Sequence, residues 1–96
     1  MTFLVILTAG PRTEAVQTVL ELAAAASELG HHLEVFLSGD GVTHAGQLGG
    51  RVAGTLCDAD LRWRQSQPVD MPGVVRGSLA DLARSVRAAD RVLTFT

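Results

Sequence analysis

Short apolar runs alternate along this chain with longer segments whose apolar positions recur at helical spacing. The runs predict strands at Phe3–Leu7, Leu33–Leu37, Val52–Leu56 and Arg91–Thr96. Helical spacing predicts one helix over Pro11–Leu29, closed by a glycine, and a last helix that ends near Ala89. A run as continuously apolar as the first is typical of a strand buried on both faces. Strands alternating with helices predict an α/β fold with a mostly parallel sheet and helices on both faces.

The connecting segments carry weaker signals. The Ser78–Asp81 segment has the spacing of a capping box, which marks the start of the last helix. The remaining segments predict a tight turn at Ser38–Gly41, a short irregular or helical piece over Val42–Leu48, a loop over Gln67–Pro72 and a brief extended piece over Gly73–Arg76. The stretch Asp58–Gln65 is compatible with a short helix or a loop, and the pattern does not decide between them.

Length and composition limit the class of protein. The 96 residues suit a single domain over residues 1–96, with one core. An apolar content of 47% and a formal net charge of -2 argue against disorder and give no general attraction to nucleic acid or to an anionic membrane. No apolar run approaches the roughly 20 residues that span a bilayer. The first residues lack the pattern of a signal peptide. We therefore expect a cytoplasmic protein whose partners are proteins or small molecules.

The single cysteine is the sharpest candidate for chemistry. Cys57 directly follows the third apolar run, at the carboxyl end of a predicted strand, and open α/β sheets place their chemistry at that edge. Arg62 and Arg64 are candidate cations that would lower the pKa of the thiol. Asp58 and Asp60 would raise it, unless they are helix caps that point away. The alternative is that Cys57 is a small buried hydrophobe, as lone cysteines in strands usually are.

Other polar residues have simpler explanations. The glycines at 39–50 match neither the Rossmann fingerprint nor the P-loop, although the turn Gly10-Pro11-Arg12 offers a place for an anion at a helix N-terminus. His31 and His32 follow a helix end, where an imidazole complements the helix dipole. Together with His44 they are too few for a metal site, and we expect none. Trp63 is expected to cover the core or a protein interface. The chain has no lysine, which excludes a Schiff-base mechanism.

Several short motifs, in this order and spacing, resemble the DsrE/DsrF/TusD family of small sulfur-relay proteins. They cover nearly the whole chain: Gly10-Pro11 after the first strand, Ala24 to Gly30-His31, Val35-Phe36-Leu37 leading to Asp40-Gly41-Val42, Cys57 ahead of Arg62 and Arg64, and Ala88 to Leu93.

The resemblance implies a three-layer α/β/α sandwich with about five strands that assembles into trimers or hexamers. In active members a cysteine accepts a persulfide and passes the terminal sulfur onward. Cys57 matches that position, and Arg64 follows it at a family-like distance as an electrostatic helper. We therefore expect a sulfur carrier or sulfurtransferase subunit that uses protein sulfur donors and acceptors and no metal or organic cofactor.

Two other hypotheses stay open. In the first, the protein is a noncatalytic assembly or binding module in which Cys57 is merely packed. In the second, it binds a small anion with the Gly10-Pro11-Arg12 turn and the Gly39–Gly41 loop.

Overall fold

Five parallel strands form one sheet. The computed structural model describes residues 1–10, 13–63 and 73–96. The sheet has the order β4-β3-β2-β1-β5, and every pair of neighbours is parallel. The strands are β1 (Thr2–Leu7), β2 (His32–Leu37), β3 (Ala53–Cys57), β4 (Val74–Gly77) and β5 (Arg91–Phe95). The predicted α/β class and parallel sheet are confirmed.

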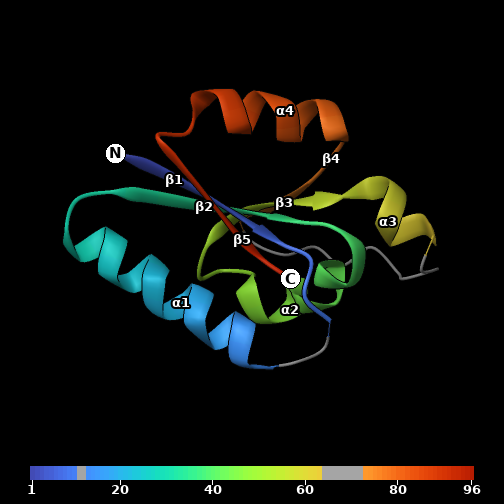
Figure 1. The fold of residues 1–96 in the computed structure, drawn as a ribbon. Helices are drawn as coiled ribbons and strands as arrows, with labels where there is room; N and C mark the ends of the chain where they lie inside the picture. Colours follow the sequence, from blue (N-terminus) through green and yellow to red (C-terminus); the bar gives the residue numbers. More distant parts are fainter. Residues whose placement is uncertain (11–12, 64–72) are drawn as a thin grey trace.

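Helices cover both faces of the sheet, as Figure 1 shows. The long helix α1 (Thr13–Glu28) and the short α2 (Ala45–Leu48) lie on one side, and α4 (Leu79–Ala88) lies on the other. A 3-10 helix, η1 (Gly39–His44), follows β2, and α3 (Asp58–Trp63) follows β3. None of the helices in the described parts of the chain is long and apolar enough to cross a membrane.

The apolar runs are explained by burial on both faces of the sheet. Val5 and Leu7 of β1 point to the α1 side and belong to the larger buried cluster. Leu4 of β1 and Phe36 of β2 point to the α4 side, where they form a smaller cluster with Cys57. Alternate side chains of a strand point to opposite faces, so a strand between two helical layers is apolar at nearly every position.

The structure also shows the conformation of the connecting segments that it describes. The Ser38–Gly41 turn is present as the first turn of η1, with the Gly41 N–H donating to the Ser38 carbonyl oxygen at 2.9 Å. The stretch after Cys57 is helical as far as Trp63. The extended piece after Gly73 is the edge strand β4. The predicted loop over Gln67–Pro72 lies outside the described residues.

Candidate functional site

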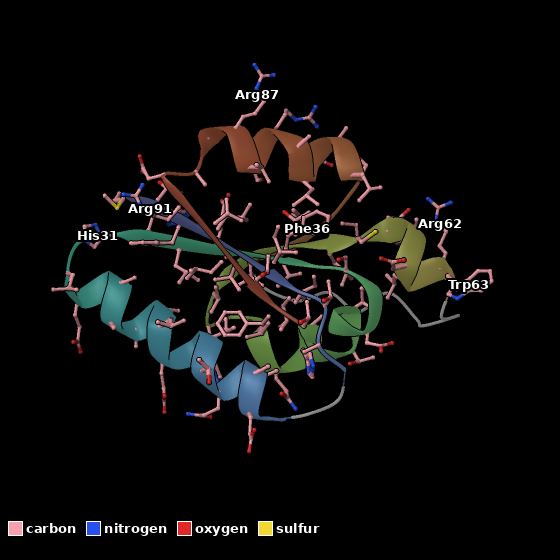
Figure 2. The ribbon with its side chains drawn as sticks, viewed as in Figure 1. His31, Phe36, Arg62, Trp63, Arg87 and Arg91 are labelled. Atoms are coloured by element: carbon pink, nitrogen blue, oxygen red, sulfur yellow. The ribbon has the colours of Figure 1, made fainter. Side chains whose placement is uncertain are left out.

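Cys57 is the last residue of β3, at the carboxyl edge of the sheet, as predicted. Its neighbour across the ladder is Gly77, the last residue of β4. The side chain points to the α4 face, where it packs with Leu4 and Phe36, and Figure 2 shows Phe36 between the sheet and α4. Cys57 is 3% exposed. The thiol is thus part of the smaller core cluster and also lies at its edge.

An open cleft of about 900 Å³ begins at this cysteine. It lies at the carboxyl ends of the neighbouring strands β3 and β4 and between the first turns of α3 and α4. α3 follows Cys57 without any connecting residue, and α4 follows Gly77 after Ser78 alone. Because both strands run in the same direction, the two helices begin side by side. The residues around the cleft are Cys57, Asp58, Ala59, Asp60, Arg62, Arg76, Gly77, Ser78, Leu79, Ala80 and Asp81.

Helices α3 and α4 each begin directly beside the end of a strand. In α4 the predicted capping box is present: the Asp81 N–H donates to Ser78 Oγ at 3.4 Å, and Asp81 Oδ2 accepts the Ser78 N–H at 2.7 Å. In α3 the cysteine has the position of the serine, directly before the first helical residue.

The environment of Cys57 holds its thiol in the protonated form. Burial is the largest cause and raises the pKa of the thiol. The backbone N–H groups of Asp60 and Ala59 lower that pKa, whereas the Asp60 carboxylate raises it through a hydrogen bond and through its charge. The net effect is a raised pKa. Of the two aspartates singled out from the sequence, Asp60 is the one that acts on the sulfur.

Asp58 turns away from the sulfur and binds two arginines. Its Oδ2 accepts the Arg62 Nε–H at 2.8 Å, and its Oδ1 accepts the Arg76 Nε–H at 2.6 Å. These hydrogen bonds lower the pKa of the Asp58 carboxyl, with Arg62 the larger cause. In Figure 2 the Arg62 side chain extends outward from α3. The expectation that Arg62 assists the thiol is therefore wrong, because its guanidinium is bound to Asp58 one helical turn away.

Arg76 is the residue of this site that sequence reasoning missed. It lies 18 residues after Asp58, and no local pattern joins the two. The signal is in the fold: Arg76 pairs with Leu56 in the parallel register of β3 and β4, one position before Cys57. The other predicted cation, Arg64, lies outside the described residues.

The histidines and the tryptophan singled out from the sequence do not line the cleft at Cys57. His44 is buried, and its Nε2 lies 3.1 Å from the Ala9 carbonyl oxygen and 2.7 Å from that of Gly10, so it donates to the segment that follows β1. His31 Nδ1 lies 3.2 Å from the amino-terminal nitrogen. Trp63 is 85% exposed, so of its two expected roles it does not cover the core, and a role at a protein interface stays a prediction.

The described parts of the chain contain no group of three or more His, Cys, Asp and Glu that would hold a metal ion. Near the proposed anion turn, a Cβ placed on Gly10 would lie 3.6 Å from Asp40 Oδ2, so a carboxylate faces this turn. Pro11 and Arg12 of that turn lie outside the described residues, and the binding of a small anion there stays a prediction.

Comparison with known proteins identifies the family. The sequence model of the DsrE/DsrF-like family matches residues 1–65, which include β1 to β3 and Cys57. The chain belongs to the DsrE/DsrF-like family. Among solved structures it is similar to the ychN protein from E. coli, with a TM-score of 0.75 and 26% sequence identity over 99% of this chain and 100% of that chain. No curated protein matches it.

The Asp58 ion pairs generate a pH-dependent prediction. The pKa of Asp58 is lowered from 3.8 in the folded protein, so its ion pairs stabilise the fold above that value and are lost as the pH falls through the lowered pKa. Asp58→Asn should lower the urea midpoint at neutral pH, and the difference from wild type should shrink towards zero in acid. Urea unfolding at a series of pH values measures this. Glu28→Gln, at an exposed position of α1, is the control; an Asp58→Asn difference that persists unchanged in acid would contradict the assignment.

Proposed function

We propose that this protein is a cytoplasmic sulfur carrier or sulfurtransferase subunit that accepts sulfane sulfur on Cys57 as a persulfide and passes it to a second protein. Membership of the DsrE/DsrF-like family supports a role related to sulfur relay. The observation that carries the proposal is the position of the only cysteine in the chain, at the carboxyl end of β3 and at the edge of an open cleft.

The proposed chemistry needs one thiolate and no cofactor. The Cys57 thiolate attacks the outer sulfur of a donor persulfide, so a bond forms between the two sulfurs while the donor's own sulfur–sulfur bond breaks. The electron pair of the broken bond leaves with the donor as a thiolate, which takes up a proton. The thiolate of an acceptor protein then attacks the outer sulfur on Cys57 in the same way. Oxidation states balance in each step, so no outside oxidant or reductant is required.

Two features of the site favour this chemistry. The backbone N–H groups of Asp60 and Ala59 lower the pKa of the Cys57 thiol, which favours negative charge on the sulfur when it attacks. The cleft gives a donor's sulfur a path to this edge of the sheet, where Gly77 has no side chain.

A second candidate function is supported by the burial of Cys57. With 3% exposure and a thiol whose pKa is raised chiefly by burial, Cys57 also fits a packed cysteine in a noncatalytic assembly module. This alternative expects slow reaction of Cys57 with a thiol reagent in the folded protein and fast reaction only after unfolding.

We also propose that copies of the chain, or related subunits, join through the α4 face to form a trimer or hexamer. Four exposed apolar side chains lie on this face, on three different elements: Val75 of β4, Leu79 and Val86 of α4, and Val92 of β5. Val75 and Val92 are placed there by the register of β4 and β5 with β3 and β1. No residue of α4 is buried within the single chain. Packing of this face against another subunit would remove these exposed apolar side chains from water.

Persulfide loading tests the proposed function. The reduced protein, incubated with a low-molecular-weight persulfide, should gain the mass of one sulfur atom, because its single thiolate accepts the outer sulfur of the donor. Intact-mass spectrometry measures the gain. Cys57→Ser is the matched control and should gain nothing while it unfolds at a similar urea concentration.

Two results would contradict the proposal. One is sulfur gain in Cys57→Ser, which would place the acceptor elsewhere. The other is no gain in the wild type together with no reaction of native Cys57 with a thiol alkylator, which would favour the packed cysteine.

The proposed assembly face is tested by placing a charge in it. Val86→Glu should lower the molar mass measured by light scattering, because a buried carboxylate without a partner opposes association. Leu29→Glu is the control, since Leu29 is 73% exposed and lies after α1, in the opposite layer. A wild-type protein that is monomeric, or equal behaviour of the two variants, would rule out this face.

A further inference from the structure

β5 forms an open edge of the sheet. The strand order places β5 at one end and β4 at the other. In the described parts of the chain β5 pairs with β1 alone, in an unbroken parallel register from Arg91 to Phe95. Figure 1 shows β5 crossing in front of the other strands, at the near edge of the sheet. An edge strand of this kind presents backbone N–H and C=O groups that a further strand can bind.

The outward-facing backbone groups of β5 belong to Val92 and Thr94. The Thr8 N–H donates to the Phe95 carbonyl oxygen at 2.9 Å, so Phe95 turns its carbonyl towards the β1 side. Successive residues of a strand point their backbone groups alternately to its two neighbours. Leu93 therefore also faces β1, while the N–H and C=O groups of Val92 and Thr94 face away from the sheet.

Apolar side chains lie on both faces of this edge. Val92 is 40% exposed and Leu93 is 39% exposed. Register with Leu4 places Val92 on the α4 face, and register with Val5 places Leu93 on the α1 face. A strand added to the edge would shield both side chains from water, whereas a subunit packed on one face would shield only one of them.

The opposite edge of the sheet is protected from strand pairing. β4 is short, Val74–Gly77, and the guanidinium of its Arg76 binds Asp58. Short edge strands and charged side chains are devices by which natural sheets block a further strand. β5 contains neither proline nor glycine, and its one charged residue, Arg91, lies at its start. β5 is therefore the edge that is open to pairing.

We propose that β5 of one copy pairs antiparallel with β5 of a second copy, about a twofold axis at Leu93, and joins the two sheets into one. A twofold contact requires a surface that is complementary to itself. With Val92 opposite Thr94 of the second copy, every outward backbone group of the two residues meets a partner, because both residues turn these groups away from β1. Leu93 then lies opposite Leu93 of the second copy.

The side chains of β5 fit this register. The two Leu93 side chains meet at the axis on the α1 face, at the close spacing of a pair without mutual hydrogen bonds. On the same face Arg91 lies opposite Phe95 of the second copy, where a guanidinium and an aromatic ring attract each other. On the other face Val92 lies opposite Thr94, and both are β-branched. Since like charges do not face each other, the second copy is the occupant that the sequence of β5 fits.

This contact goes beyond the proposed sulfur chemistry and leaves its site open. β2 and β1 lie between β3, which carries Cys57, and β5. The cleft at Cys57 is lined by residues of β3, α3, β4 and the start of α4. The contact also differs from the one proposed for the α4 face, with which it shares Val92 alone. A trimer held through the α4 face would be doubled by it into a hexamer.

Charge exchange at the twofold axis tests the pairing. Leu93→Glu and Leu93→Arg each place two like charges opposite each other, because residue 93 faces itself in the second copy. Each variant alone should show half the wild-type molar mass in light scattering. An equimolar mixture of the two should recover the wild-type mass, because each contact then joins a carboxylate and a guanidinium. Urea midpoints close to that of the wild type show that the variants are folded.

Proline at the edge tests the backbone bonds. Thr94→Pro removes an N–H that points away from β1, so the ladder within the chain is kept while a bond to the second copy is lost. This variant should also have half the wild-type molar mass. Thr94→Ala, which shortens the side chain and keeps the N–H, is the matched control and should keep the wild-type mass.

Several results would overturn the inference. They are a monomeric wild type, a mixture of the two Leu93 variants that stays at half the mass, and equal masses for Thr94→Pro and Thr94→Ala. If the β5 variants keep the wild-type mass while Val86→Glu lowers it, the copies join through the α4 face alone, and pairing through β5 is overturned.

Discussion

The direct junction between β3 and α3 is the constraint on which the rest of the site depends. Because no residue separates the strand from the helix, Cys57 ends the sheet ladder and directly precedes the helix. The backbone N–H groups of Ala59 and Asp60, in the first turn of that helix, lower the pKa of its thiol. A loop at this point would separate the sulfur from those N–H groups.

The same junction explains why groups that raise the pKa of the Cys57 thiol and groups that lower it lie close to the same sulfur atom. Helix N–H groups stabilise a thiolate, whereas burial under α4 and the carboxylate of Asp60 destabilise it. Asp58 keeps two guanidinium groups bound at the rim of the cleft. A fully stabilised thiolate would react with any electrophile, and a fully buried thiol with none. The balance at Cys57 is compatible with the sulfur carrier that we propose.

Much of the fold could be predicted because both faces of the sheet are buried. The apolar run of β1 has a helical layer on each side, and the capping box at Ser78 marks α4 without any knowledge of tertiary structure. The site was less predictable. The pairing of Arg62 with Asp58, four residues earlier, is readable from helical spacing, but only once the segment is known to be a helix. The role of Arg76 depends on strand register, which the local sequence does not contain.

Release of sulfur from Cys57 is the measurement that tests the central claim most directly. The loaded protein would be separated from its donor and mixed with an acceptor thiol, and its intact mass followed with time. A carrier should return to the mass of the reduced protein while the acceptor gains the same amount of sulfur, with the fold retained throughout. A sulfur atom that never enters, or that stays on the protein while the acceptor gains none, would contradict the account.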